Sequence, residues 1–379
     1  MTLLQRYRIG VDIGGTFTDF ALFDDETGDV TTHKRLTSAA DPSQAVVEGV
    51  GILAAEAGIA VADVATIVHG TTLVTNAVIE RKGAPTAMLV SKGFRDTLDI
   101  GLERRYDLFD LRIRFPEPLV ARHLRFEVPE RVKYDGTVLK APDFDGLLAP
   151  LAAAIERDAI EAIAICFLHS YVDPAHEREA AAWVARHFPT LKISVSSEIF
   201  PNMREFERWT TTCMNAFVQP VVDRYVSHLE IGLAGLGFRG NFLIMTSSGG
   251  TFTGALARRF PVRLLESGPA AGALMSARHG RALGLDQILS FDMGGTTAKG
   301  CIVRDGVPLK RYELEVGRVH EFKRGSGLPA RIPVLDMIEI GAGGGSLADV
   351  DERGVPVSYT HLRAHETKAN LVCRLLLEK

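Results

Sequence analysis

The sequence predicts an α/β protein with two lobes that bind one ligand between them. Short apolar runs alternate with longer amphipathic segments along most of the chain, as they do in α/β units. In addition, an aspartate followed by Gly-Gly-Thr occurs twice, once within residues 11–19 and again within residues 291–299. Because two similar loops suit one ligand held from both sides, we expect a single bipartite site.

In each copy an apolar run carries the aspartate, stops at the glycines and resumes after them, which predicts a β-hairpin with a glycine turn. Glycines let backbone N–H groups approach an anion, and the threonine hydroxyl adds a donor, so both loops suit phosphate. The aspartates, Asp12 and Asp292, suit a hydrated Mg²⁺ or an oriented water. The residues that we expect to contact phosphate are Gly14, Gly15, Thr16, Thr18, Gly294, Gly295 and Thr296.

One such loop alone would more often be an ordinary turn, but the pair resembles the phosphate loops of the actin-like ATPase superfamily. The resemblance implies two ribonuclease-H-like lobes around a nucleotide cleft. We place the first lobe at residues 1–195 and the second at residues 202–357, and we expect the second lobe to be incomplete. The boundary is expected between residues 188 and 202, where two prolines flank a short strand.

The composition is that of an ordinary globular chain. Its 379 residues are 46% hydrophobic and 24% charged, which is enough for two or three cores. A net charge of −4 gives no general reason to bind nucleic acid or an anionic membrane. No apolar run approaches the length of a membrane span and no signal core precedes the first strand, so we expect a cytoplasmic location. The four cysteines form no C-x-x-C pair, so neither a disulfide scaffold nor a cysteine-type zinc site is indicated.

A second group of polar residues follows a short strand at residues 66–68. His69, Thr71 and Thr72 stand at the start of a helix, where N–H groups and the positive end of the helix dipole are exposed. We therefore consider them for the acceptor side of a reaction. An N-cap box beside a satisfied histidine explains the same residues equally well.

The remaining elements follow from periodicity and capping residues. Residues 103–142 mix both signs of charge with proline, which predicts a solvated loop, with a substrate or partner contact as the alternative. The helices are expected after Asp41-Pro42, at 147–157, after Asp173-Pro174, at 204–229 with an interruption at Pro220, and at 267–277, and the strands at 87–90, 160–168, 192–195 and 242–245.

A further glycine-rich stretch occupies residues 340–346. It matches only a fragment of a dinucleotide fingerprint, and no strand-helix-strand unit follows it. In an actin-like frame a glycine turn after the second phosphate loop lies beside the adenosine, so Gly341, Gly343 and Gly344 are expected there. No Walker-type motif, H-E-x-x-H or G-x-S-x-G occurs in the sequence.

Six motifs, in the same order, resemble the hydantoinase A / 5-oxoprolinase family over about residues 6–357. They are Asp12-Ile-Gly-Gly-Thr-Phe-Thr-Asp19, His69-Gly-Thr-Thr72 with Thr75-Asn-Ala77, Gly93-Phe-Arg-Asp96, Ser267-Gly-Pro-Ala-Ala-Gly272, Phe291-Asp-Met-Gly-Gly-Thr296 and Ile340-Gly-Ala-Gly-Gly-Gly-Ser346. The resemblance implies a subunit of an ATP-dependent amidohydrolase that opens a cyclic amide or imide of the hydantoin, N-methylhydantoin or 5-oxoproline type. It also implies ATP and Mg²⁺ as cofactors and a hydantoinase B-type subunit as partner.

Two other functions are compatible with the same motifs. The β subunit of an ATP-dependent acetone-type carboxylase shares them, and a non-catalytic actin-like module would bind ATP without turnover of its own. Residues 358–379 do not resemble the family, and we expect them to be a non-native tail similar to a translated sequencing adapter. On that basis the chain is expected to be a fragment.

Overall fold

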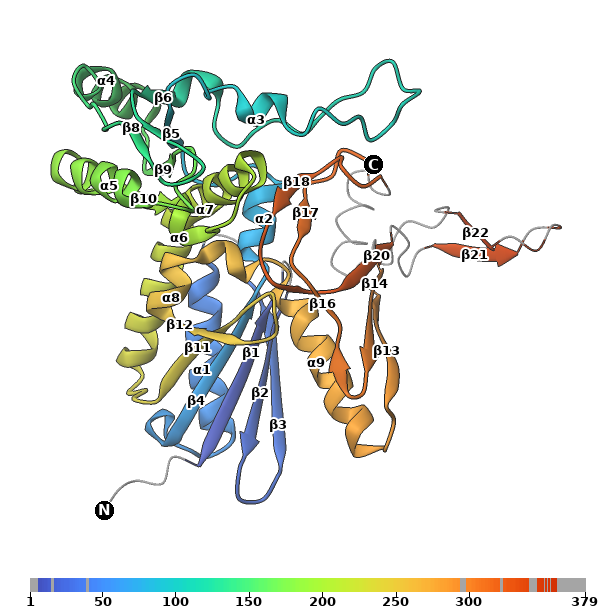
Figure 1. Ribbon diagram of the computed structural model, residues 1–379. Helices are drawn as coiled ribbons and strands as arrows, with labels where there is room; N and C mark the ends of the chain where they lie inside the picture. The colour runs from blue at the N-terminus through green and yellow to red at the C-terminus, as the bar shows by residue number, and fades with distance from the viewer. Residues whose placement is uncertain are drawn as a thin grey trace, which may run out of the picture. The chain divides into compact units, whose positions relative to one another are not determined.

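The computed structural model describes residues 6–14, 17–38, 41–293, 298–320, 323–340, 346–350 and 356–359, together with residues 352 and 354. Helices and strands alternate along it, which confirms the expected α/β class (Figure 1). The chain forms two compact units, Met1–Gly268 with Tyr312–Val334, and Pro269–Arg311 with Leu335–Lys379. The lobe boundary expected between residues 188 and 202 stays a prediction, as do the ribonuclease-H-like lobes.

A mixed six-stranded sheet forms the first half of the larger unit. Its strand order is β12-β11-β4-β1-β2-β3, with β1 parallel to β4 and antiparallel to β2. On β1 the residues Ile9, Val11 and Ile13 are buried and those between them are exposed, so the alternation of the sequence directs one face to the core. The strands are β1 Tyr7–Ile13, β2 Phe17–Asp24, β3 Val30–Leu36, β4 Val64–Thr71, β11 Asn241–Met245 and β12 Thr251–Thr253.

A parallel four-stranded sheet, in the order β10-β9-β5-β6, forms the second half of this unit. Every residue of its inner strands β5 and β9 is buried, as is usual for a parallel sheet covered on both faces. The strands are β5 Thr86–Ser91, β6 Arg125–Val128, β9 Ala162–Cys166 and β10 Lys192–Val195, and helices α4 Leu148–Asp158 and α5 Ala175–His187 accompany them.

Helix α7, Glu205–Gly235, connects the cores of the two sheets. Trp209 and Cys213 belong to the core of the parallel sheet, whereas Met214 and Phe217 belong to the core of the mixed sheet. The helix runs through Pro220 without the expected interruption. All residues from Glu207 to Pro220 are buried, so packing on both sides holds the helix together despite the N–H that proline lacks.

The expectation of a loop over residues 103–142 is wrong in its second half. Strand β6 extends the parallel sheet, and the pair β7 (Arg131–Val132) and β8 (Val138–Lys140) follows it. Arg125 is the first residue of β6 and is only 2% exposed. Its guanidinium donates to Asp99 and to the carbonyl of Val120. Arginine is usually exposed, so its presence here made the segment look like a solvated loop in the sequence.

The smaller unit contains a second hairpin, in which β13 (Gln287–Met293) pairs with β14 (Ala298–Arg304). Strand β14 also pairs with β15 (Val307–Pro308) and β20 (Met337–Ile340).

The remaining elements of the whole chain complete the description. The other α-helices and 3-10 helices (η) are α1 Pro42–Glu56, η1 Val61–Asp63, α2 Leu73–Ile79, α3 Thr97–Ile100, η2 Arg122–Leu124, α6 Ser196–Ile199, α8 Gly254–Arg259, η3 Pro261–Leu264 and α9 Ser267–Ala282. The other strands are β16 Lys310–Arg311, β17 Leu314–Val316, β18 Leu328–Ala330, β19 Val334–Leu335, β21 Leu347–Val350 and β22 Pro356–Tyr359.

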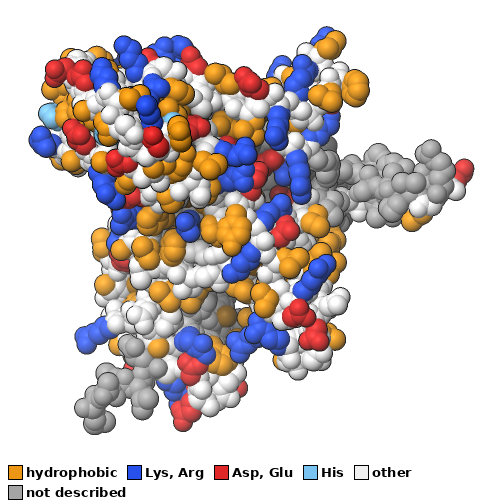
Figure 2. Space-filling view, in the orientation of Figure 1, with side chains coloured by type: hydrophobic (Ala, Val, Ile, Leu, Met, Phe, Trp, Pro, Cys, Tyr) orange, Lys and Arg blue, Asp and Glu red, His pale blue; other side chains and the backbone are white. Residues whose placement is uncertain are grey.

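The surface fits the composition. On the face shown in Figure 2, Lys and Arg side chains are interspersed with Asp and Glu, in keeping with the net charge of −4. Among the described residues, none of the helices combines the length and the apolar character needed to cross a membrane.

Candidate functional site

Asp12 lies one residue before the end of β1, at the carboxyl edge of the mixed sheet. Its strand neighbours are Asp19 on β2 and Gly70 on β4. A Cβ added to Gly70 would lie 3.0 Å from Oδ1 of Asp12, and one added to Gly268 would lie 3.7 Å from the same oxygen. Two glycines thus border this exposed carboxylate and leave the space around it open.

The hairpin turn after Asp12 uses part of its hydrogen-bonding capacity internally. Gly14 N–H donates to the carbonyl of Phe17 at 2.9 Å, and the carbonyl of Gly14 accepts from Oγ1 of Thr37 at 3.0 Å. Oγ1 of Thr37 also lies 3.0 Å from Oγ1 of Thr18, which is completely buried. Thr18 therefore stabilises the turn through its contact with Thr37. Its complete burial corrects the expectation that it contacts a ligand. Gly15 and Thr16 lie outside the described residues.

Helix α2 begins beside this turn. Oγ1 of Thr72 lies 3.4 Å from the carbonyl of Ile13, to which it donates, and Oγ1 of Thr71 accepts from the N–H of Leu73 at 3.1 Å. Oγ of Ser267 donates to the carbonyl of Thr71 at 3.0 Å, which fixes the start of α9 to the end of β4. Thr71 is 3% exposed and stabilises the start of α2, whereas Thr72 is half-buried.

His69 does not lie with these residues. It is completely buried, its Nε2 lies 2.7 Å from Oη of Tyr225 on α7, and its ring stacks on Phe242. Burial lowers the pKa of His69 to about 4, so the imidazole is neutral at pH 7. The expectation that His69 contacts an acceptor is wrong, because the alternation of β4 directs the histidine into the core. His69 is a core residue, although its Nδ1 has no hydrogen-bond partner among the described residues.

A cavity of about 320 Å³ opens between the turn after β1 and the start of α2. Its lining includes Gly14, Thr37, Thr71, Thr72 and Asn76, so hydroxyl and amide groups from three segments meet at one place. The sequence did not indicate Thr37, and it indicated Gly268 only as a member of the Ser267–Gly272 motif. A threonine directly after β3, whose strand pairs with the hairpin, is the signal that could have indicated Thr37.

The second hairpin repeats the geometry of the first. Met293 pairs with Ala298 as Ile13 pairs with Thr18, and Asp292 stands one residue before the strand end as Asp12 does. The strand pairing of the two expected hairpins is thus confirmed. Asp292 is exposed and pairs across the strands with Lys299. Gly294, Gly295, Thr296, Gly341, Gly343 and Gly344 lie outside the described residues.

These features fit a hydrated cation better than a bare one. Within the described part of the chain, no three His, Cys, Asp or Glu side chains converge as a metal-binding group. Mg²⁺ commonly keeps several waters and binds through one or two carboxylates together with substrate phosphates. An exposed carboxylate at the edge of a glycine turn, such as Asp12, suits that mode of binding.

The chain was compared with known protein families and proteins. Residues 8–188 match the model of the hydantoinase/oxoprolinase N-terminal region, and residues 208–367 match the hydantoinase/oxoprolinase model. The chain belongs to the hydantoinase/oxoprolinase family. The second match ends at residue 367, and the expectation that residues 358–379 are a non-native tail stays a prediction.

Relatives of this hydantoinase/oxoprolinase chain include enzymes with different names. An uncharacterized protein of Methanocaldococcus jannaschii is 37% identical over 92% of this chain and 52% of its own length. The caprolactamase subunit alpha of Pseudomonas jessenii is 32% identical over 93% of this chain and 50% of its own length. The 5-oxoprolinase 1 of Arabidopsis thaliana is 31% identical over 90% of this chain and 28% of its own length. The chain thus spans about half the length of the first two relatives and 28% of the length of the third.

Two solved structures share the fold. The ATP-dependent caprolactamase from Pseudomonas jessenii superposes with a TM-score of 0.79 and 29% identity, over 96% of this chain and 51% of that one. Nucleotide-free acetone carboxylase superposes with a TM-score of 0.76 and 24% identity, over 94% of this chain and 51% of that one. The mixed α/β architecture of this family member is therefore that of both enzymes.

Proposed function

We propose that this chain is the ATP-binding subunit of an amidohydrolase that opens a cyclic amide or imide of the hydantoin, N-methylhydantoin or 5-oxoproline type. The observation that carries the proposal is the carboxylate of Asp12, bordered by Gly70 and Gly268 at a glycine turn, in a family that includes an ATP-dependent caprolactamase. An unactivated amide carbonyl is a poor electrophile. Transfer of a phosphoryl group from ATP to the carbonyl oxygen makes the carbonyl carbon more electrophilic, so that water can attack it.

The residues have distinct roles in this proposal. Asp12 and Asp292 hold Mg²⁺ or its waters, and Thr72 stands on the acceptor side, where it orients the oxygen that receives the phosphoryl group. Thr71 acts indirectly, because it holds the start of α2 in place. The residues that surround the phosphates in this proposal are Gly14, Gly15, Thr16, Gly294, Gly295 and Thr296. Gly341, Gly343 and Gly344 lie near the adenosine.

The strand order supports an actin-like interpretation of the mixed sheet. Strands β3, β2 and β1 are antiparallel neighbours, and β4 and β11 continue the sheet in parallel with β1, which is the arrangement of a ribonuclease-H-like lobe. We extend this to a second lobe around the β13–β14 hairpin. A B-type partner subunit completes the hydrolysis, in line with relatives that are themselves named as subunits.

A carboxylase subunit is the second candidate function. The acetone carboxylase beta subunit of Xanthobacter autotrophicus is 27% identical over 90% of this chain, and the acetone carboxylase structure shares its fold. In that case the phosphoryl acceptor would be a ketone or bicarbonate rather than an amide.

One experiment separates these functions. ATP hydrolysis by the full-length protein with its partner subunit is measured against a panel of hydantoins, lactams and 5-oxoproline, and separately against ketones with bicarbonate. Stimulation by a cyclic amide, with ring-opened product in proportion to ADP, supports the hydrolase. Stimulation by a ketone alone favours the carboxylase, and ATP binding without stimulation by either set leaves a binding module.

A further inference from the structure

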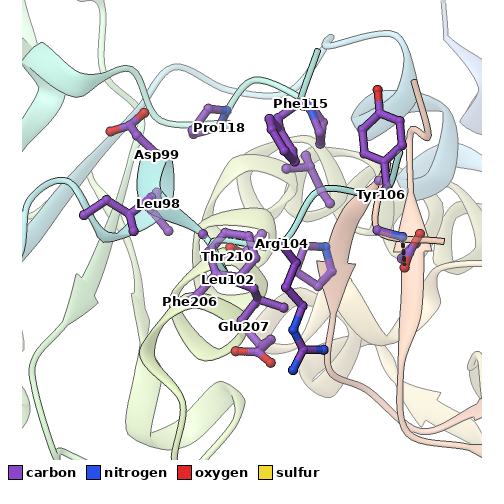
Figure 3. A pocket seen from close by; sticks show the side chains of 18 of the residues that line it. Leu98, Asp99, Leu102, Arg104, Tyr106, Phe115, Pro118, Phe206, Glu207 and Thr210 are labelled. Carbon is purple, nitrogen blue, oxygen red and sulfur yellow. Dashed lines mark hydrogen bonds between the residues drawn. The ribbon is translucent and has the colours of Figure 1, made fainter. Parts of the chain in front are cut away.

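A larger cavity of about 590 Å³ lies elsewhere in the first unit (Figure 3). The segment of residues 98–119, the first turns of α7 and the β17–β18 hairpin surround it. It shares no lining residue with the cavity beside Gly14 among the residues described for either. Its volume lies within the range of about 300–1,000 Å³ that is usual for small-molecule sites.

Part of the cavity wall is apolar and accessible. Leu102 and Phe115 are 44% and 51% exposed, and Phe206 on the first turn of α7 is half-buried. All three line the cavity, and Figure 3 shows their side chains around one space. A ligand with an apolar body would cover these side chains and remove their apolar surface from water, which stabilises the complex.

Two arginines line another part of the wall. Arg104 and Arg324 are both exposed, and neither guanidinium has an ion pair or a hydrogen bond within the described part of the chain. The segments that carry them are in contact, since a Cβ at Gly325 would lie 3.4 Å from Cβ of Tyr106. The two positive charges therefore belong to one end of the cavity.

The acidic residues of the lining leave these charges uncompensated. Four of the five are bonded to arginines that do not line the cavity. The pairs are Asp99 with Arg125, Glu207 and Glu313 with Arg331, and Glu315 with Arg318. A third arginine of the lining, Arg105, donates only to the backbone carbonyls of Asp107 and Asp110. Among the described residues, the unpaired charges of the lining are thus three arginines and Glu103, so the cavity attracts an anion.

We propose that this cavity binds a monocarboxylate with an apolar body. Arg104 and Arg324 hold the carboxylate, and the apolar body contacts Leu102, Phe115 and Phe206. A guanidinium can donate two parallel hydrogen bonds to a carboxylate, and an apolar wall beside it strengthens the attraction between the charges. A neutral ligand would leave both arginines without a counter-charge. The binding depends on neither the nucleotide nor the proposed function.

The test is calorimetric titration of the full-length protein, without nucleotide, with 4-phenylbutyrate. Two analogues divide this ligand into its parts. The amide 4-phenylbutyramide has nearly the same shape but no charge, and we expect it to bind about 10-fold more weakly. Butyrate keeps the charge but lacks the ring, and we expect it to bind at least about 10-fold more weakly as well.

The variant that tests the charge is Arg104→Gln, which keeps most of the aliphatic stem at an exposed position. We expect it to weaken binding of 4-phenylbutyrate about 10-fold and binding of 4-phenylbutyramide less than about 2-fold. The matched control is Arg112→Gln, at an exposed arginine of the same segment that does not line the cavity. It should leave the affinity for both ligands unchanged.

Leu102→Ala tests the apolar wall. Because it removes apolar surface and no charge, it should weaken the carboxylate and the amide by the same factor, about 3- to 10-fold.

Three results would overturn this site: no heat of binding at millimolar 4-phenylbutyrate, equal affinity for the carboxylate and the amide, or equal weakening by Arg104→Gln and Arg112→Gln. Neither nucleotide nor partner subunit is present in these titrations, so their outcome is separate from that of the ATP hydrolysis measurements.

Discussion

Gly70 leaves open the space beside the carboxylate of Asp12: a Cβ at Gly70 would lie only 3.0 Å from Oδ1 of Asp12. The two residues are neighbours across the parallel pair of β1 and β4, so the position of the carboxylate depends on the absence of a side chain one strand away. A substitution of Gly70 should therefore disturb Asp12 and can be tested in the same way as a substitution of Asp12 itself.

We expect Gly70→Ala to impair nucleotide turnover without preventing folding. The backbone of Gly70 is ordinary extended strand, so alanine is allowed there, but its methyl group displaces the carboxylate of Asp12 by a few tenths of an ångström. Misplacement of a catalytic group commonly costs about 10- to 100-fold in rate. The measurement is the steady-state rate of ATP hydrolysis in the presence of substrate and partner subunit.

The matched control for this change is Gly235→Ala near the end of α7, where no atom lies within 4 Å of the added Cβ. It should leave both the rate and the unfolding midpoint close to those of the wild type. A Gly70→Ala protein as active as Gly235→Ala would show that Asp12 needs no open space beside it.

We expect Asp12→Asn and Asp292→Asn each to reduce Mg²⁺-dependent ATP hydrolysis by at least about 100-fold, because each removes a charge that holds the cation or its waters. Both aspartates are exposed at strand ends, so the fold should persist, as circular dichroism can verify. Asp286→Asn is the control, since this exposed aspartate lies just before β13 and outside the turn. Unchanged hydrolysis in both variants would remove the proposed cation role.

The hairpins were predictable from sequence because they are local. An apolar run, a Gly-Gly turn and a second apolar run determine the pairing of Ile13 with Thr18 and of Met293 with Ala298 without reference to the rest of the chain. The capped helix α1 was predictable for the same reason, and Asp41 indeed accepts from the N–H of Ser43.

The roles of other residues depend on distant partners and could not be predicted in this way. His69 is a core residue because Tyr225, far along the chain, lies beside its ring. Glu207 and Thr210 are buried because residues 98–119 and the β17–β18 hairpin lie against the first turns of α7, and both segments are distant in sequence. Burial of a polar side chain is a tertiary property, and local patterns of sequence carry little information about it.

Two glycines of α1 offer a matched pair for stability. A Cβ at Gly49 would lie 2.1 Å from the ring of Phe20 on β2, whereas one at Gly51 would meet only Leu236 at 3.7 Å. We expect Gly49→Ala to destabilise the protein by about 1–3 kcal/mol through overpacking. Gly51→Ala should instead be neutral or stabilise by up to about 1 kcal/mol, because alanine favours the helix.

Urea unfolding followed by circular dichroism measures both changes. The comparison is controlled internally, since both glycines lie on the same helix and lose the same backbone freedom. Equal stability of the two variants would mean that Phe20 moves away at little cost and that α1 is not closely packed on β2.

The burial of His69 predicts that the protein loses stability as the pH falls from 7 to 5. The pKa of this imidazole is lowered to about 4 in the folded chain, chiefly by desolvation, against an ordinary value of 6.5. The unfolded chain therefore binds the proton more readily, and the folded state loses about 2 kcal/mol at pH 5 relative to pH 7.5 from this group alone. Well above pH 6.5, by about pH 7.5, the full stability is present, because the histidine is then neutral in both states.

Since many carboxylates also titrate on folding, the contribution of His69 is isolated by His69→Gln, which does not titrate and can still bond to Oη of Tyr225. The free energy of unfolding, from urea titrations at several pH values, should fall less steeply in this variant than in the wild type between pH 7 and 5. His123→Gln, at an exposed histidine, should follow the wild-type curve. Parallel curves for the wild type and His69→Gln would mean that His69 is accessible to protons in the folded state, and its burial against Tyr225 would then have no energetic consequence.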